Sequence, residues 1–523
     1  MVGIVDESFV KFPISSRIRI NNNTGTVKYV GEVNGYDGIW IGIEWDDPSR
    51  GKHNGIVNGQ RYFQTGHPSS GSFVRVGKVA AFESLEEAAR ERYLNTSGCI
   101  LDQKLLLEAQ AHMQASLMEI VGMDKIARKQ SKLEHLTEIS VDGSNVNSAG
   151  YLMEFSNLTT LNLSHTLMWN WTDVANITSQ VPTLVNLNLS CNRMKVPTNE
   201  QTVNLEPSFR HLEHINLGNC GFKNWEDVKA TAKLWPNILS VGLQENDILE
   251  LTPVDCMEIF KNLRELDLHR TKVSDFDQVV KLGNIKTLNC LHLMENGIEE
   301  VKLPECDPNK KLNIFIALEK LNLYNNPIYD EIGTFNELDK LPALVNLSMT
   351  PHLKSDFEEM FSKAIASIPQ LKVVNKIEIT KEDRRGADYD IWKRYALDWM
   401  QCEKNPDLKF AFCKKHRSYP LLVKKYGSPA EFVPRNLGKV SNLIKLRIQN
   451  KITGEVWEKK VPRKISVQTL QGLIIKQFKL ENTMPKLSYA DAKHPDLIVE
   501  LENTSKNLDF YSIHEGDTVT VEW

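Results

Sequence analysis

A short phrase built on leucine recurs through the middle of this chain and limits the folds open to it. The phrase reads LTTLNL from residue 158 and LVNLNL from residue 184. Nine copies begin at residues 136, 158, 184, 212, 238, 263, 288, 318 and 344, so successive copies start 22 to 30 residues apart. A segment of this length cannot bury its apolar side alone, and it must stack on its neighbours. The period therefore predicts a solenoid.

The phrase matches the pattern L-x-x-L-x-L-x-x-N/C-x-L, and this region resembles the leucine-rich repeats. Each repeat is then expected to supply a short strand and a return arm, with the leucines in one continuous core. The N/C position needs a side chain that hydrogen-bonds the backbone of the turn, and hydroxyl groups can make similar bonds. This position holds Thr166, Asn192, Cys220, Asn246, Thr271, Asn296 and Asn326.

The strand residues between the last two apolar positions are expected on the open face of the solenoid, away from the leucines. They are polar, small and carry little charge: Asn162, Asn188, Asn216, Gly242, Asp267, His292, Asn322 and Ser348. Nine strands about 4.8 Å apart span roughly 40 Å, which is wide enough for a folded protein. His269, Met294 and Tyr324 flank this face as possible contacts, and a merely solvated face is the alternative.

Residues 14–81 hold 11 of the 28 glycines of the chain, placed between short apolar and β-branched runs. Short strands joined by glycine turns predict a small all-β barrel. The loop GKHNG begins at Gly51, between GIWIGIE and NGQRYF, and GSFVR follows from residue 71. This ordered set resembles the CAP-Gly domain, which has an SH3-like barrel and usually carries GKNDG in this loop. His53 and Asn54 depart from that pattern.

A peptide-binding groove is predicted in this domain. Its glycines let a ligand approach the backbone and expose N–H groups, and Lys52 adds a cation. Eight Lys and Arg against five Asp and Glu make residues 14–81 positive, which suits an acidic peptide with an aromatic end and a free carboxylate. The resemblance implies the acidic, Tyr-ended tail of α-tubulin as ligand, with Lys52 and His53 at its carboxylate and Trp40 and Phe73 around its aromatic ring. The candidate residues are Trp40, Gly51, Lys52, His53, Asn54, Gly55, Phe63, Phe73 and Arg75. The aromatic residues can also belong to the core, and the loop can be only a turn.

The rest of the chain divides into four parts. Residues 82–130 read as a mainly helical connector that caps the solenoid, with a partner-binding helix as the alternative. The α/β repeats and their C-terminal cap fill 131–400, where Thr380 and Asp383 form a helix N-cap pair. Within residues 401–439, the stretch 404–439 carries nine Lys and Arg against two acidic residues, together with four prolines. They predict a basic linker, either solvated or in contact with an acidic partner.

Residues 440–523 resemble an α+β ubiquitin-like β-grasp domain. This domain is expected to dock on a partner and not to be conjugated to other proteins, since the sequence shows no Gly-Gly tail.

Several classes of function are excluded by what the sequence lacks. It contains no phosphate-binding loop, no G-x-S-x-G elbow and no H-E-x-x-H, so we expect neither an enzyme nor a cofactor. Eight cysteines without a C-x-x-C pair, and histidines without ligand spacing, predict a reducing compartment and no metal site. No apolar run reaches 18 residues and no secretory signal is present, so a cytoplasmic protein without membrane spans is expected. A net charge of −4 gives no support to nucleic acid as a partner.

CAP-Gly domain, leucine-rich repeats and ubiquitin-like domain together resemble the tubulin-folding cofactor E family, over essentially the whole chain. The resemblance implies a chaperone of the cytoplasm and the microtubule cytoskeleton that binds α-tubulin. With other tubulin-folding cofactors it would assemble αβ-tubulin heterodimers and also dissociate them. The ubiquitin-like domain would meet another cofactor or the proteasome. Two alternatives stay open: a CAP-Gly microtubule-associated adaptor, and an adaptor that links a partner to the ubiquitin–proteasome system.

Overall fold

The computed structural model describes residues 12–94, 133–432, 443–480, 484–491, 494–508, 510–511, 513 and 515–523. The chain forms two compact units. The first comprises residues 1–274 and 278–297, and the second comprises residues 275–277 and 298–523.

The first unit begins with a small all-β domain, as predicted. Four antiparallel strands follow the order β1-β2-β3-β6: β1 (Arg17–Ile20), β2 (Asn23–Val33), β3 (Tyr36–Trp45) and β6 (Gly71–Arg75). One face of this sheet buries the core, which includes Ile18, Val27, Ile41 and Ile43. A separate hairpin pairs β4 (Ile56–Val57) with β5 (Gln60–Arg61). Its turn is Asn58-Gly59, with positive φ at both residues, which is typical of a two-residue hairpin turn.

Short elements lead from this domain to the repeats. The 3-10 turn η2 (Val76–Lys78) is followed by β7 (Glu83–Ser84) and helix α2 (Leu85–Leu94), while the 3-10 turn η1 (Pro48–Arg50) lies within the first domain, between β3 and β4. Strand β7 pairs in parallel with β9 (Val146–Ser148). Helix α2 confirms the helical start of the predicted connector, and the expected solenoid cap over 95–130 lies outside the described residues.

The repeats of the first unit supply seven described strands, each centred on the middle leucine of the repeated phrase or its equivalent. They pair in parallel along the chain: β8 (Glu138–Ser140), β10 (Thr160–Asn162), β11 (Asn186–Asn188), β12 (His214–Asn216), β13 (Ser240–Gly242), β14 (Glu265–Asp267) and β15 (Cys290–His292). The central residues stand in register and are at most 3% exposed: Ile139, Leu161, Leu187, Ile215, Val241, Leu266 and Leu291. The predicted register of the repeats is therefore confirmed in this unit.

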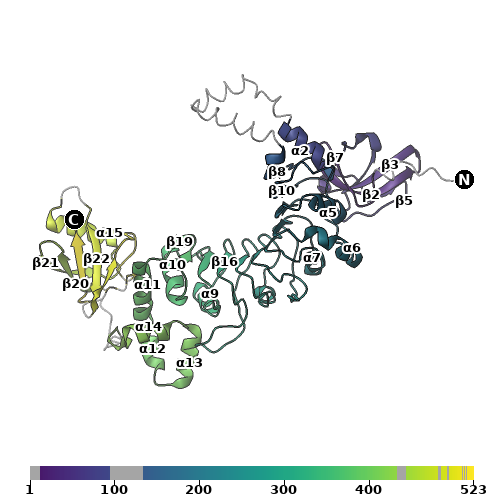
Figure 1. Ribbon diagram of the computed structural model, residues 1–523. Helices are drawn as coiled ribbons and strands as arrows, with labels where there is room; N and C mark the ends of the chain where they lie inside the picture. The colour runs from purple at the N-terminus through teal and green to yellow at the C-terminus, as the bar shows by residue number, and fades with distance from the viewer. Residues whose placement is uncertain are drawn as a thin grey trace. The chain divides into compact units, whose positions relative to one another are not determined.

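The return arms of these repeats are helices and irregular segments (Figure 1). The helices are α5 (Trp171–Gln180), α6 (Asn199–Leu205), η5 (Glu206–Phe209) and α7 (Trp225–Ala232), while α8 (Phe276–Val280) includes residues of both units; η4 (Leu133–His135) precedes the first strand. Asn170 caps α5 by accepting from the N–H of Asp173, and Asn224 caps α7 in the same way from Asp227.

Side chains at the N/C position bond the turns, as the sequence predicted. The amide nitrogen of Asn192 donates to the carbonyl oxygens of Leu163 and Leu189, at 2.8 and 3.0 Å. The hydroxyl of Thr166 donates to the Leu163 carbonyl at 2.8 Å, so a hydroxyl does take the same role. The residue just before this position has a positive φ in seven repeats, although none of them is glycine: His165, Cys191, Asn219, Glu245, Arg270, Glu295 and Asn325.

The second unit contains the last two repeats and their cap. Strands β16 (Lys320–Leu323) and β17 (Asn346–Met349) pair in parallel, β17 also pairs with β18 (Val373–Val374), and β18 turns back antiparallel to β19 (Ile377–Glu378). The helices are α9 (Glu331–Leu338), α10 (Phe357–Ser367) and α11 (Lys381–Arg394). The Thr380 side chain accepts from the N–H of Asp383, and the Asp383 carboxylate accepts from the N–H of Thr380. This capping box confirms the predicted N-cap pair.

The predicted linker over residues 401–439 is wrong as far as the structure describes it, up to residue 432. Residues 396–432 form α12 (Ala396–Cys402), α13 (Pro406–Lys415), α14 (Tyr419–Tyr426) and η6 (Pro429–Phe432). These helices close an aromatic core around Trp392, Trp399 and Tyr419. Pro406 and Pro420 stand in the first turns of their helices, where no intrahelical N–H bond is lost. The prolines thus separate short helices, and they do not mark an unstructured segment.

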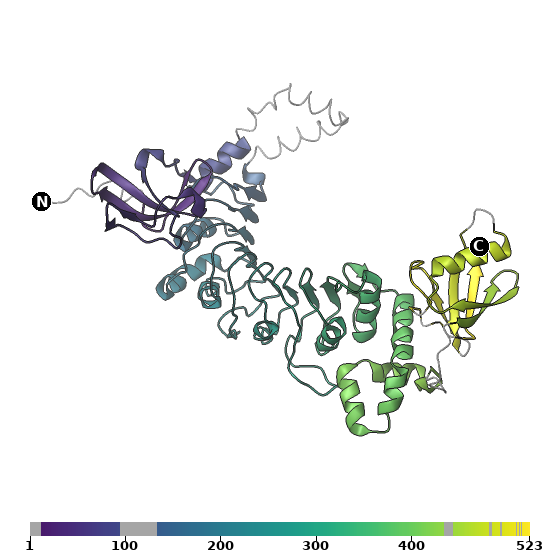
Figure 2. The same ribbon diagram turned by 180° about the vertical axis from the view of Figure 1, so that it is seen from behind.

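The C-terminal part has the predicted ubiquitin-like fold (Figure 2). Its five strands follow the order β21-β20-β24-β22-β23, with β20 and β24 parallel: β20 (Leu443–Asn450), β21 (Val456–Pro462), β22 (Lys486–Asp491), β23 (His494–Glu500) and β24 (Thr518–Glu522). Helix α15 (Val467–Phe478), capped by Ser466, packs its apolar side on this sheet. Among the described parts of the chain, no helix is both long and apolar enough to cross a membrane.

Candidate functional site: an aromatic groove on the first domain

The candidate site lies on the sheet face opposite the core of the first domain. Along β3, Ile41 and Ile43 point into the core, so Trp40 and Gly42 face the other way. In the antiparallel pair of β3 and β6, Trp40 stands opposite Arg75 and Gly42 stands opposite Phe73. The sheet therefore brings Trp40, Phe73 and Arg75 onto one face, as the groove hypothesis requires.

The GKHNG loop is fastened across this face by its own backbone. The N–H groups of Lys52 and His53 donate to the Gly71 carbonyl at 2.7 and 3.2 Å, and the Gly71 N–H donates to the His53 carbonyl at 2.7 Å. The Gly55 N–H donates to Nδ1 of His53 at 3.0 Å. These three loop N–H groups are thus bonded within the domain, and the expectation that glycines expose them to a ligand is wrong for these positions.

Two glycines of the loop are required by close packing. A Cβ on Gly51 would lie 2.1 Å from the carbonyl oxygen of Ser69. A Cβ on Gly55 would lie 2.1 Å from the carbonyl oxygen of Phe63, and Gly55 also has a φ of +89°. Both glycines therefore hold the loop against its neighbours and serve the site through its shape.

An aromatic cluster fills the space between the loop and the sheet. The Phe73 ring lies at its centre, with ring centroids 5.5 Å from His53 and 5.3 Å from Phe63. The rings of Tyr29 and Tyr62 complete the cluster, 6.0 and 5.5 Å from Phe73. Neither tyrosine was among the predicted site residues, although Tyr62 lies within the NGQRYF segment of the recognised set. Tyr29 is signalled only by its place on β2 across from Gly42.

Trp40 and Arg75 form a second group beside this cluster. The Arg75 guanidinium lies over the Trp40 ring, 3.9 Å from its centroid, in a cation–π contact. Arg75 also donates to the carbonyl oxygen of Asp37. The indole nitrogen of Trp40 is buried and has no hydrogen-bond partner among the described residues. A ligand oxygen that reached it would find a free donor.

An open cavity of about 640 Å³ adjoins the aromatic cluster. Tyr29 and Tyr62 form part of its wall, and Tyr36 and Arg61 form another part. None of the nine predicted site residues lines this cavity. Glu32 and Asp37 also face it, so its rim carries both signs of charge.

Charge on the loop side of the face is positive. The Lys52 side chain is exposed and forms no ion pair with any described residue. Burial, and then the charge of Lys52, lower the pKa of His53 below its ordinary value, so the ring is neutral at pH 7 and its Nδ1 accepts the Gly55 N–H. Burial, and then Tyr62 and Glu32, raise the pKa of Tyr29. Lys52 is therefore the charged group of this loop that a ligand carboxylate can reach.

The structure places the nine predicted residues in two roles. Lys52, Asn54, Trp40 and Arg75 lie at the surface or are half-buried, and Phe73 and His53 form the half-buried floor, so these six suit direct contact. Phe63 is only 6% exposed and packs under the loop, where it supports the site without lining it. Gly51 and Gly55 likewise act through shape.

Fold and site together define a multidomain protein with a CAP-Gly domain, leucine-rich repeats and a ubiquitin-like domain. The CAP-Gly family model matches residues 14–79. The chain is 62% identical over 523 residues to "Tubulin-specific chaperone E" of Drosophila melanogaster, covering 100% of both chains. It is 32% identical over 525 residues to the protein of that name from Mus musculus, covering 98% of each.

A solved structure, the C-terminal ubiquitin-like domain of mouse tubulin-specific chaperone e, matches at 32% identity and a TM-score of 0.15, covering 17% of this chain and 94% of that one. The identities of 62% and 32% to the two chaperones extend over 98% or more of each chain, and they show the family. The chain belongs to the tubulin-specific chaperone E family.

Proposed function

We propose that this chain binds α-tubulin and, with other tubulin-folding cofactors, assembles αβ-tubulin heterodimers and also dissociates them. The observation that carries the proposal is its 62% identity, over the full length of both chains, to a protein named for a tubulin-specific chaperone. The proposed action is binding and not catalysis, in the cytoplasm and at the microtubule cytoskeleton.

The proposed role of the aromatic groove is to hold the acidic, Tyr-ended tail of α-tubulin. In this role the Lys52 ammonium pairs with the terminal carboxylate, and the Phe73 and Trp40 rings pack against the terminal aromatic ring. Asn54 and Arg75 complete the polar contacts. This assignment is supported by the shared face of Trp40, Phe73 and Arg75 and by the exposed, unpaired cation of Lys52.

The repeats are proposed to contact the body of tubulin through the strand residues that face away from the leucine core. The eight predicted positions of this face are all half-buried. Several of them already bond their own backbone: the side-chain oxygens of Asn188, Asn216 and Asp267 accept from the N–H two residues further on. These residues shape the ends of the strands, which leaves the more exposed flanking side chains as contacts. Tyr324 is one of these, at 42% exposed. The ubiquitin-like domain is proposed to dock on another cofactor or on the proteasome.

A peptide titration tests the groove. The probe is an acidic peptide that ends in tyrosine with a free carboxylate, measured by calorimetry against the full-length chain. Lys52→Ala removes one charge-assisted hydrogen bond, worth about 1.5–3 kcal/mol, so we expect affinity to fall at least about tenfold. Lys78→Ala is the matched control, since Lys78 is an exposed lysine of the same domain outside the groove. We expect it to bind like the unmodified chain.

The peptide itself supplies a second control. Amidation of its terminal carboxylate should weaken binding to the unmodified chain, and it should matter less for Lys52→Ala, because the pair is already broken. Equal affinity of Lys52→Ala and Lys78→Ala would refute the role of Lys52. If removal of the terminal tyrosine abolishes binding but amidation has no effect, the aromatic pocket is supported and the pairing of Lys52 with the terminal carboxylate is refuted.

A further inference from the structure

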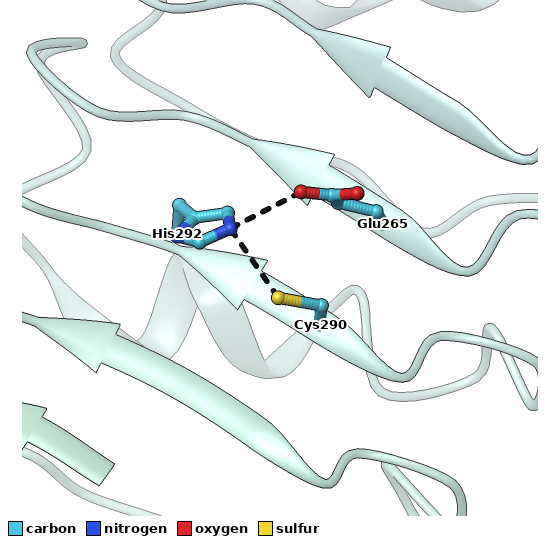
Figure 3. A group of neighbouring side chains, drawn as sticks. All are labelled: Glu265, Cys290 and His292. Atoms are coloured by element: carbon cyan, nitrogen blue, oxygen red, sulfur yellow. Dashed lines mark hydrogen bonds and ion pairs between the residues drawn. The ribbon is translucent and has the colours of Figure 1, made fainter. Parts of the chain in front are cut away.

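We propose that the repeats carry a zinc site formed by Glu265, Cys290 and His292. The three side chains come from two neighbouring strands, β14 and β15, on the face away from the leucine core (Figure 3). Figure 3 shows the three functional groups pointing toward one another. The sequence alone predicted no metal site, because it has no C-x-x-C pair and no histidines at ligand spacing.

Strand register explains how the cluster forms. Glu265 and Cys290 are direct partners in the parallel pair of β14 and β15, and His292 lies two residues beyond Cys290. Residues two apart on a strand point to the same face. The buried leucines 266 and 291 lie between them and point the other way. All three side chains therefore come from strands whose opposite face is packed in the leucine core, which fixes their backbone positions.

The distances suit a tetrahedral metal. Nε2 of His292 lies 3.3 Å from a carboxylate oxygen of Glu265 and 3.3 Å from Sγ of Cys290. The three ligand atoms all lie within 4.8 Å of one another. Zinc bonds of about 2.0–2.3 Å at tetrahedral angles place neighbouring ligands roughly 3.4–3.6 Å apart. The Glu265 side chain is 47% exposed, so a small rotation brings its oxygen to that distance from sulfur.

The proton on Nε2 of His292 decides which neighbour that nitrogen can bond when the ring is neutral. Its Nε2 then either carries a proton that Glu265 accepts, or carries a lone pair that accepts the Cys290 S–H. The first state satisfies both contacts, with sulfur as a weak acceptor, whereas the second places two lone pairs, on Nε2 and on the carboxylate, against each other. A cation at the centre removes the conflict of the second state, because all three atoms then turn lone pairs toward it.

Ligand chemistry favours zinc among the divalent metals. A set of one thiolate, one imidazole and one carboxylate joins soft, intermediate and hard donors, and Zn²⁺ accepts all three. On binding, the Cys290 thiol gives its proton to solvent, so the thiolate and the Glu265 carboxylate balance the 2+ charge. Three protein ligands leave the fourth tetrahedral position for water. The metal would also clamp β14 to β15.

Neighbouring positions show that this arrangement is particular to one repeat. In five other repeats the residue equivalent to His292 accepts from a backbone N–H two residues further on: Asn162, Asn188, Asn216, Asp267 and Asn322. His292 is instead directed at Glu265 and Cys290. His269 lies 3.0 Å from Asp267 without a cysteine beside it, which makes it a natural control.

Cobalt titration of the full-length chain tests the proposal. Tetrahedral Co²⁺ bound to a thiolate gives intense visible bands and a sulfur-to-metal charge-transfer band in the near ultraviolet. We expect one Co²⁺ per chain, displaced by one equivalent of Zn²⁺. Cys290→Ser should abolish the charge-transfer band, and Glu265→Gln and His292→Gln should each weaken Zn²⁺ binding at least tenfold in chelator competition. Zn²⁺ should also raise the midpoint of thermal unfolding, because a ligand bound only to the folded state stabilises it.

Matched controls separate this site from adventitious binding. Cys191→Ser and His269→Gln change the same residue types on nearby repeats and should leave both affinity and spectrum unchanged. Circular dichroism checks that each variant is folded. The proposal is overturned by a charge-transfer band that survives in Cys290→Ser, by equal losses in the control variants, or by the lack of stoichiometric binding to the folded chain. None of these results depends on tubulin binding.

Discussion

Replacing Asn246 with alanine removes four hydrogen bonds of 3.0 Å or less from the interior of the repeats, and a longer one of 3.4 Å to the Gln244 carbonyl. Its amide nitrogen donates to the carbonyl oxygens of Leu217 and Leu243, each at 2.9 Å. Its amide oxygen accepts from the N–H groups of Gly221 and Phe222, at 2.9 and 3.0 Å. The residue is 2% exposed, so solvent cannot replace these bonds without an opening of the structure.

The size of the effect follows from the groups left behind. A buried donor or acceptor without a partner costs about 1–3 kcal/mol. Two N–H groups and two carbonyls at the lower end of that range give a loss of about 4 kcal/mol. A folded domain is stable by only about 5–15 kcal/mol, so this part of the solenoid should open far more often.

Native-state hydrogen exchange of residues 212–246 in the full-length chain measures this loss, because exchange reports the free energy of local opening. Asn237→Ala is the matched control: Asn237 is exposed, and its amide donates to a single acceptor, the Arg210 carbonyl, at 2.7 Å. We expect that control to cost less than about 1 kcal/mol. An Asn246→Ala loss below about 1 kcal/mol, or one equal to the loss in the control, would refute the reasoning.

Two further predictions concern charge and pH. Burial lowers the pKa of His416 to about 4, so stability is full above the unfolded value of 6.5 and falls by up to about 3 kcal/mol as the pH drops toward 4. Thermal unfolding at pH 7 and pH 5 should show this loss, and His416→Phe should reduce it. Arg17 is 2% exposed and pairs with Asp46 at 2.8 Å, so Asp46→Asn should cost about 3 kcal/mol in chemical unfolding of the first domain. If Asp46→Asn lowers the free energy of unfolding no more than Asp47→Asn does, at a fully exposed neighbouring residue, the stabilising role of the Arg17–Asp46 pair is contradicted.

The repeats were predictable because the leucines that recur with the period are also the residues that are buried. Each strand leucine must face the core, and this fixes the register of every neighbouring strand. The bonding residues followed from the same register, including Thr166 and Thr271, which depart from the usual pattern but still donate to the turn carbonyls.

The helices after residue 402 were missed because charge and proline were given more weight than aromatic residues. Nine basic residues and four prolines suggested a solvated linker. The basic side chains are partly neutralised inside the fold, since Arg417 pairs with Asp339 at 3.1 Å and Lys425 pairs with Asp388 at 2.7 Å. Trp399 and Tyr419 supply the core.

The site was predictable where a motif runs along the chain and not where strands bring residues together. Lys52, His53 and Phe73 belong to the motif, whereas Tyr29 lies outside it and joins the cluster only through folding. Tyr62 stands in the NGQRYF segment, but its contact with Phe73 follows only from the fold. The same limit applies to the proposed zinc site. Cys290 and His292 lie within three residues, but Glu265 comes from the preceding repeat and is paired with them only by strand register.

The measurement that tests the central claim most directly combines the purified full-length chain with soluble αβ-tubulin in size-exclusion chromatography. We predict a 1:1 complex with α-tubulin, with β-tubulin released or passed to another cofactor. A heterodimer that elutes unbound, with binding only to polymerised microtubules, would contradict the account and favour a microtubule-associated adaptor. Binding to neither form would mean that the groove holds some other acidic tail.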